Sequence, residues 1–66
     1  MSEVVGTVVE QLPSALYRVK LDGGGQIVAH IADRIERNFI RVLVGDRVRL
    51  ELSSADVTRG RIVARL

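Results

Sequence analysis

The sequence contains no cysteine, and among its 66 residues there is a single histidine, His30. Without cysteine no disulfide can brace the fold, and no thiolate can hold a metal ion. One histidine alone cannot supply a zinc site. Because small extracellular domains usually carry disulfides, we expect a cytoplasmic protein that binds no metal and no other cofactor.

Long hydrophobic runs are also missing. No segment approaches the roughly 18 apolar residues that a membrane-spanning helix needs, and the first residues lack the basic region of a signal peptide. Hydrophobic residues nevertheless make up 47% of the chain against 27% charged residues, which is too apolar for a disordered segment. We therefore expect residues 1–66 to form one folded domain with no membrane attachment.

Recognisable catalytic motifs are missing as well. No serine or carboxylate stands in a nucleophile or acid–base arrangement with His30. The three glycines at 23–25 lack the Lys-Ser/Thr ending and the long helix that a phosphate-binding loop requires, so we interpret them as a hairpin turn. The sequence predicts a binding protein, not an enzyme.

Most of the chain shows the alternation of apolar and polar residues that is typical of β-strands. Five strands are predicted, at residues 4–11, 17–21, 26–31, 47–52 and 61–65. Gly6 is expected to mark a bend or bulge in the first strand. The alternation also assigns a core face, consisting of Tyr17, Val19, Leu21, Ile27, Ala29, Ile31, Val48, Leu50 and Leu52.

Residues 33–39 change from the strand period to a helical one. Asp33 can cap a helix with Glu36 at the capping-box position, and Ile35 and Phe39 lie on one side. Five strands with a helix in this place have the order of an OB-fold. The predicted fold is therefore all-β, a five-stranded antiparallel OB-fold barrel with one short helix between strands 3 and 4. An SH3-like barrel of similar size is the alternative.

Positive charge is concentrated in the second half of the chain. Residues 1–33 hold two basic and four acidic residues, whereas residues 34–66 hold eight basic and four acidic ones. Nine of the ten basic residues are arginine, whose guanidinium group pairs with phosphate through two hydrogen bonds. This distribution favours a polyanion-binding surface, although an ordinary solvated face has a similar composition.

The outer face of the second and third strands is the first candidate for such a surface, because OB-folds commonly receive oligonucleotides there. Alternation places Arg18, Lys20 and His30 on this face. The one tyrosine and the one phenylalanine are both expected in the core, which leaves no aromatic side chain for stacking on bases. Basic residues without stacking aromatics suit a folded RNA that is contacted through its phosphates.

Six segments carry a resemblance to a known family: 6–13 (GTVVEQLP), 17–21 (YRVKL), 28–31 (VAHI), 37–43 (RNFIRVL), 45–48 (GDRV) and 56–62 (DVTRGRI). In this order and spacing, from residue 6 to residue 63, they resemble bacterial translation initiation factor one. The resemblance implies an S1-like OB-fold protein without catalytic activity that binds the small (30S) ribosomal subunit at the aminoacyl-tRNA entry (A) site. It also implies contacts with the decoding region of the ribosomal RNA and a neighbouring ribosomal protein, and joint action with initiation factors two and three.

The resemblance further implies which residues contact ribosomal RNA. Between the third and fourth strands these residues are Arg34, Arg37, Asn38 and Arg41. In the last hairpin they are Arg59 and Arg61, with Arg65 beyond it, and His30 also matches a histidine of the family. The chain departs from the family pattern at Asp33, Glu36 and Ala64 and in its short basic tail. We expect the protein to be a monomer when it is free. The alternative to an initiation factor is a general RNA-binding protein or RNA chaperone of the cold-shock type.

Overall fold

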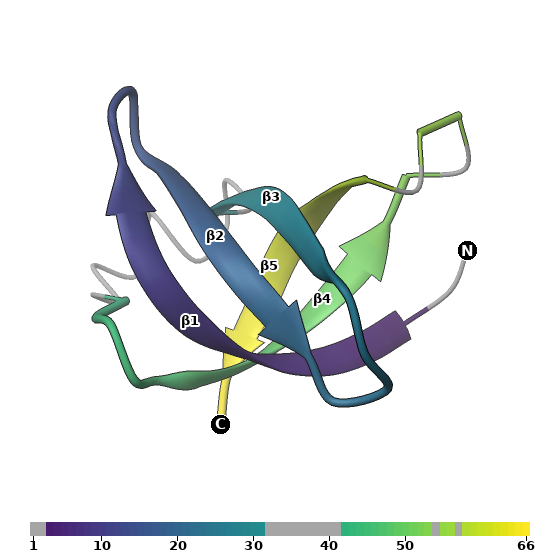
Figure 1. Cartoon of the computed structure of the whole chain (residues 1–66), viewed down its shortest axis with the longest axis horizontal. Helices are drawn as coiled ribbons and strands as arrows, with labels where there is room; N and C mark the ends of the chain where they lie inside the picture. The colour runs from purple at the N-terminus through teal and green to yellow at the C-terminus, as the bar shows by residue number, and fades with distance from the viewer. Residues whose placement is uncertain (1–2, 32–41, 54, 57) are drawn as a thin grey trace.

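The computed structural model describes residues 3–31, 42–53, 55–56 and 58–66. Its strands, listed in chain order, are β1 (Glu3–Leu12), β2 (Leu16–Leu21), β3 (Gln26–Ile31), β4 (Arg47–Leu52) and β5 (Arg59–Arg65). All five predicted strands are therefore confirmed, and β5 begins two residues earlier than predicted. The strands form a closed, OB-like barrel in the order β1-β2-β3-β5-β4 (Figure 1).

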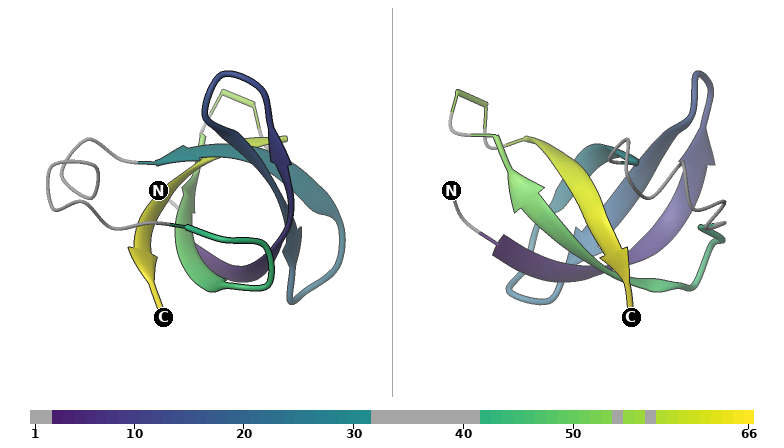
Figure 2. Two further views of the ribbon diagram at one scale, coloured as in Figure 1. Left: turned by 90° about the vertical axis from the view of Figure 1, so that its left-hand side faces the viewer. Right: turned by 180° about the vertical axis from the view of Figure 1, so that it is seen from behind.

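The prediction that all strands pair in antiparallel fashion is wrong, because β3 and β5 are parallel. The other four neighbouring pairs are antiparallel. Direction can alternate all the way around a closed ring only if the number of strands is even. With five strands one pair must run in the same direction, and Figure 2 shows β3 and β5 side by side where the barrel closes. The sheet is therefore mixed.

Two expectations concerned helices. The predicted short helix over residues 33–39 lies outside the described residues. Within the described part of the chain, no helix is long and apolar enough to cross a membrane.

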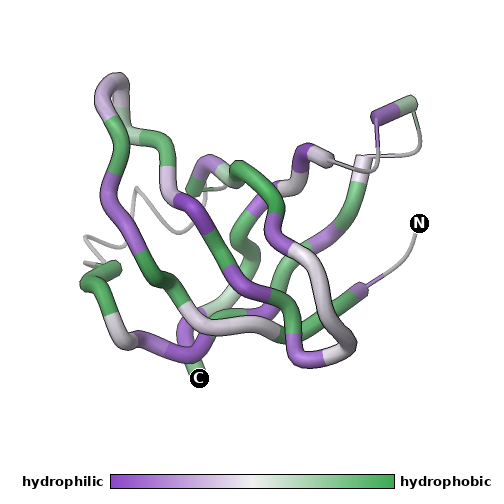
Figure 3. The backbone as a smooth tube through the Cα atoms, viewed as in Figure 1, coloured by the Kyte–Doolittle hydropathy of each residue, from purple (hydrophilic) through white to green (hydrophobic). Residues whose placement is uncertain are grey.

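The core fills the barrel from all five strands. Six of the nine residues predicted to face inward are buried, and the other three (Leu21, Ile31 and Leu52) are partly buried and packed against them. Val8, Ile62 and Val42, the last from the segment before β4, complete the cluster. This packing follows from the alternation of apolar and polar residues along each strand. Figure 3 shows it as hydrophobic and hydrophilic stretches that alternate along the backbone. The outward side chains of the same strands form the surface on which a partner can bind.

Gly6 has a different role from the predicted one. The bulge in β1 falls between Val8 and Glu10, not at Gly6. Gly6 lies where β1 pairs with both β2 and β4, and a Cβ atom there would come within 2.6 Å of the Lys20 carbonyl oxygen. The glycine is therefore needed for the close approach of two strands.

The predicted turn at residues 22–25 is confirmed. The Leu21 amide donates to the Gly25 carbonyl at 2.9 Å, and the Gly24 amide donates to the Leu21 carbonyl at 3.0 Å. Gly24 and Gly25 have φ angles of 106° and 84°, in the region that glycine adopts without steric cost. This turn fixes the register of β2 on β3 and so the positions of the outward residues on both strands.

Candidate RNA-binding surface

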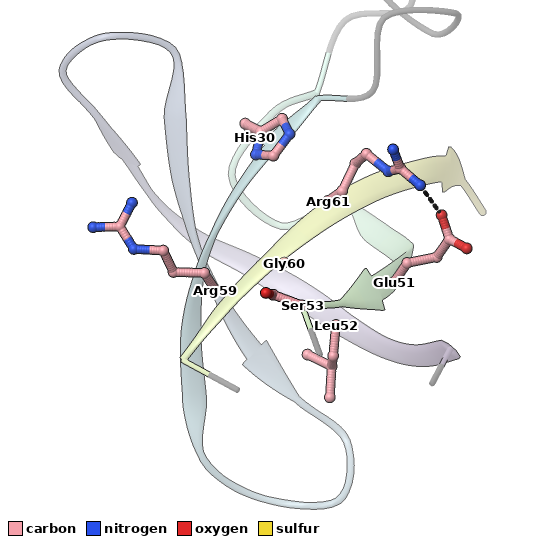
Figure 4. A pocket seen from close by; sticks show the side chains of 7 residues that line it. All are labelled: His30, Glu51, Leu52, Ser53, Arg59, Gly60 and Arg61. Atoms are coloured by element: carbon pink, nitrogen blue, oxygen red, sulfur yellow. Dashed lines mark hydrogen bonds and ion pairs between the residues drawn. The ribbon is translucent and has the colours of Figure 1, made fainter. Parts of the chain in front are cut away.

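A groove on the outside of the barrel, with a volume of about 440 Å³, lies over β3, β5 and β4. Figure 4 shows the side chains around it, and its lining residues are His30, Glu51, Leu52, Ser53, Arg59, Gly60 and Arg61. Three of these were predicted as RNA contacts from the sequence, namely His30, Arg59 and Arg61. The structure brings them together, although they come from two strands that are far apart in the sequence.

Strand register explains how these side chains meet. Arg61 of β5 lies opposite His30 of β3 on one side and opposite Glu51 of β4 on the other. Directly paired residues on neighbouring strands point to the same face, about 5 Å apart. The parallel β3–β5 pair, which the sequence did not predict, is therefore what places His30 beside Arg61.

A second cross-strand row extends this surface beyond the groove. Val28 of β3 lies opposite Arg18 of β2 and opposite Arg59 of β5. Arg18 in turn lies opposite Glu10 of β1. The outer faces of β2, β3 and β5 thus carry Arg18, His30, Arg59 and Arg61 as one group, which we call the groove face.

Each arginine of the groove face already has a carboxylate partner. Arg18 pairs with Glu10 at 3.0 Å, Arg59 with Asp56 at 3.7 Å, and Arg61 with Glu51 at 2.5 Å. The arginine side chains are nevertheless 43–72% exposed, so a ligand can reach them. Any phosphate that binds here must therefore compete with a protein carboxylate for the same guanidinium group.

The β4–β5 connection holds its acidic residue in a defined place. Asp56 accepts hydrogen bonds from the Thr58 hydroxyl at 2.6 Å and from the Thr58 amide at 2.9 Å. These hydrogen bonds lower the pKa of Asp56. Desolvation raises it by a smaller amount, and the positive charge of Arg59 lowers it further. The Asp56 amide donates to the Ser53 hydroxyl at 3.2 Å. The ionised carboxylate thus remains beside Arg59 at the entrance to the last strand.

Two further predicted site residues, Lys20 and Arg65, are described by the structure and do not line the groove. Lys20 of β2 lies opposite Thr7 and Gln26, and Arg65 lies opposite Val48 near the end of β5. The other four predicted contacts lie outside the described residues: Arg34, Arg37, Asn38 and Arg41.

Sequence reasoning missed several polar and charged residues on the outer surface of the barrel, two in the groove and two outside it. Glu51 and Ser53 line the groove, and nothing in the sequence marks them, because their position depends on the pairing of β4 with β5. Arg47 and Arg49 were also missed, although they occupy outward positions of a predicted strand in the basic half of the chain. The alternation of polar and apolar residues in 47–52 was therefore enough to predict that these two arginines face outward.

The groove face offers cationic donors, and the Ser53 hydroxyl and the Glu51 carboxylate line the groove beside them; these groups suit the phosphate and ribose groups of RNA. Tyr17 is only 8% exposed, so it provides no platform for stacking on bases. In the described segments, no group of three or more histidine, cysteine or acidic side chains is placed to hold a metal ion. The surface therefore suits contact with the backbone of a folded RNA.

Comparison with solved structures extends this picture. The solution structure of translation initiation factor one from the Wolbachia endosymbiont strain TRS of Brugia malayi matches with a TM-score of 0.80 and 42% identity, over 98% of this chain and 77% of that one. YjeQ from Thermotoga maritima and YloQ, a circularly permuted GTPase, also match with TM-scores of 0.80. Their identities are 23% and 19%, and each match covers 98% of this chain but 23% of the other. At such low identity these two show the barrel fold alone.

A family model described as "Translation initiation factor 1A / IF-1" matches residues 1–66. That description names a factor of protein synthesis and no catalysed reaction. The match spans the whole chain and agrees with the 42% identity to the solved structure of the Wolbachia factor. The chain therefore belongs to the translation initiation factor 1A / IF-1 family.

Proposed function

We propose that this protein binds the small ribosomal subunit during initiation, at the site where aminoacyl-tRNA enters. There it contacts the decoding region of the ribosomal RNA and a neighbouring ribosomal protein, and it assists initiation factors two and three in assembling the initiation complex. The observation that carries the proposal is the family match over residues 1–66. It acts as a single OB-fold domain in the cytoplasm, and it is a monomer until it binds.

The groove face supplies a physical basis for this binding. Arg59 and Arg61 present guanidinium groups on the outside of one strand, and His30 lies opposite Arg61 on the next strand (Figure 4). Such a group of donors can hold successive phosphates of an RNA strand while the barrel behind it stays rigid. Discrimination then comes from the shape of the RNA, because most of these contacts are made to the backbone.

The residues from Arg34 to Arg41 belong to the proposal only through the family resemblance, since they lie outside the described residues. We propose that Arg34, Arg37, Asn38 and Arg41 contact the minor groove of the decoding helix. Their three positive charges would add to those of the groove face.

A general single-strand binder of the cold-shock type is less well supported. Such proteins stack bases on exposed aromatic side chains, and Tyr17 is buried in the barrel. The second aromatic residue, Phe39, lies outside the described residues. The family match therefore remains the stronger argument, and it favours the ribosomal subunit as the target.

Co-sedimentation tests the proposal. The protein should sediment with purified small subunits and should be displaced by tRNA bound at the A site, and it should bind an unstructured RNA of equal length much more weakly. Arg61→Ala should weaken subunit binding, whereas Arg61→Lys should retain part of it because the charge remains. Equal binding to the unstructured RNA would contradict the proposal and favour the general RNA-binding alternative.

A further inference from the structure

Positive charge without a carboxylate partner lies on a different part of the barrel from the groove. Among the described residues, the side chains of Lys20 and Arg49 make no ion pair and no hydrogen bond. Both residues are exposed. By contrast, each of the three arginines on the groove face is paired with an acidic residue. The least compensated positive charge of the described surface is therefore outside the groove.

Strand register brings these charges into one belt. Thr7 of β1 lies opposite Lys20 of β2 on one side and opposite Arg47 of β4 on the other. The Cα atoms of Lys20 and Arg47 are thus two strand spacings apart, about 10 Å. Arg49 follows Arg47 on the same face of β4, between Val5 of β1 and Ala64 of β5. We call Lys20, Thr7, Arg47 and Arg49 the β1–β4 belt.

The belt has clear electrostatic limits. Asp22 contacts it and accepts hydrogen bonds from both terminal nitrogens of Arg47, at 2.8 and 2.6 Å. These hydrogen bonds and the negative charge of Asp22 raise the pKa of Arg47 and fix the direction of its guanidinium group. At the other end the belt stops at Glu3 and Glu51, which lie opposite each other on β1 and β4. Three basic residues with one carboxylate bonded to them leave the belt positive.

We infer that the β1–β4 belt binds a second stretch of RNA phosphate backbone, so that the protein contacts RNA on two sides of the barrel. The inference rests on the proposed function for the identity of the polyanion as RNA. Its physical basis is that an unpaired cation gains the full benefit of counterion release, whereas a groove-face arginine must first give up its carboxylate. The cross-strand neighbours of Arg49 are apolar, so neither of them competes with a phosphate for its guanidinium group.

Alanine substitutions test the belt. Arg49→Ala and Lys20→Ala should each weaken binding to small subunits about tenfold, and each should reduce the slope of log affinity against log salt by about 0.7–0.9. Gln11→Glu is the matched control, because it changes net charge by the same amount at an exposed position near the far end of β1. If the alanine variants bind with the affinity and salt slope of the parent, the inference is wrong.

Titration of the same variants with a short RNA duplex separates this inference from the proposed function. If the parent fails to bind subunits but binds the duplex, and the alanine variants lose duplex binding, the belt is supported and the proposed function is contradicted. If the parent binds subunits and the alanine variants bind both targets normally, only the belt is contradicted.

A crosslink identifies what covers the belt. The chain has no cysteine, so Thr7→Cys supplies a single thiol between Lys20 and Arg47 for a photo-reactive reagent. Crosslinks from this position in the subunit complex should form with ribosomal RNA. Crosslinks to a ribosomal protein, or none at all, would overturn the inference, and Gln11→Cys gives the background level.

Discussion

Arg47 and Asp22 are joined by two side-by-side hydrogen bonds of 2.8 and 2.6 Å, although 25 residues separate them in the sequence. Arg47 begins β4, and Asp22 lies in the turn that connects β2 with β3. Strand β1 runs between the two elements, and the Arg47 guanidinium also donates to the Thr7 hydroxyl at 3.5 Å. The pair therefore ties the β2–β3 turn to the opposite side of β1.

Breaking this pair should loosen the turn more than the barrel. Asp22→Asn should lower the melting temperature modestly, because both side chains are about half exposed and water screens their attraction. The difference between variant and parent should shrink as salt is raised to about 1 M. A double-mutant cycle with Arg47→Gln isolates the pair. If the effects of the two substitutions simply add, the side chains do not stabilise each other in solution.

The strands and most of the core could be predicted because each strand has one buried face. In β2, for example, Val19 is fully buried while Lys20, next in sequence, is exposed, as alternation requires. The parallel β3–β5 pair could not be predicted from local sequence, since it follows from closing a ring of five strands. The bulge at residues 8–10 was misplaced to Gly6 because a glycine inside a strand has more than one structural use.

The binding surface was only partly predictable for a related reason. His30, Arg59 and Arg61 could be named from chemistry and family resemblance, but their placement on one face depends on the register of β3 against β5. Their carboxylate partners were invisible in the sequence. Glu51 pairs with Arg61 across β4 and β5, and the register of that pair shifts at a bulge near Arg49. Composition predicts positive charge, and only the paired strands show where it is neutralised.

Gly6→Ala should destabilise the barrel strongly. The new Cβ would lie 2.6 Å from the Lys20 carbonyl oxygen and 2.7 Å from Cγ1 of Val19, so backbone must shift. Forcing an extra methyl group into packed structure costs about 1–3 kcal/mol, which urea unfolding can measure. Gly23→Ala is the control, because no atom lies within 4 Å of a Cβ placed there. Equal stabilities for the two variants would mean that β1 and β2 are not packed as described.

Acid should weaken the β4–β5 connection through Asp56. The hydrogen bonds from Thr58 hold the pKa of Asp56 below its ordinary value of 3.8. Because the pKa is lower in the folded state, the ionised carboxylate favours folding. This contribution is complete above about pH 4 and is lost as pH falls through the folded-state pKa. Thr58→Val should raise the pKa of Asp56 in an NMR titration and should make this acid-dependent loss smaller.

The conservative variant distinguishes the hydroxyl from general effects of substitution. Thr58→Ser keeps a hydroxyl group at the same position, so the pKa of Asp56 should stay below 3.8. If Thr58→Val leaves that pKa unchanged, the Thr58 hydroxyl is not bonded to Asp56 in solution.

Glu51→Gln tests whether paired carboxylates restrain the groove face. Glu51 is 17% exposed and accepts a hydrogen bond from Arg61 at 2.5 Å, so it holds the guanidinium group that the proposed function assigns to an RNA phosphate. The amide keeps the shape of the side chain but removes its charge. Arg61 should then exchange to phosphate more easily, and affinity for small subunits should rise about three- to tenfold at low salt.

The control for Glu51→Gln is Glu3→Gln, which makes the same charge change directly opposite it on β1. Only long-range electrostatics should change in that variant, so its effect on affinity should be small and should disappear at moderate salt. The rise for Glu51→Gln should persist there, because a short charge-assisted hydrogen bond to Arg61 has been weakened to a neutral one and not only a distant charge removed. Weaker binding by Glu51→Gln would reverse the assignment. It would mean that Glu51 orients Arg61 toward its ligand and does not compete for it. Pairing with a carboxylate would then not weaken phosphate binding by the groove face, and the unpaired cations of the β1–β4 belt would have no advantage over the paired arginines.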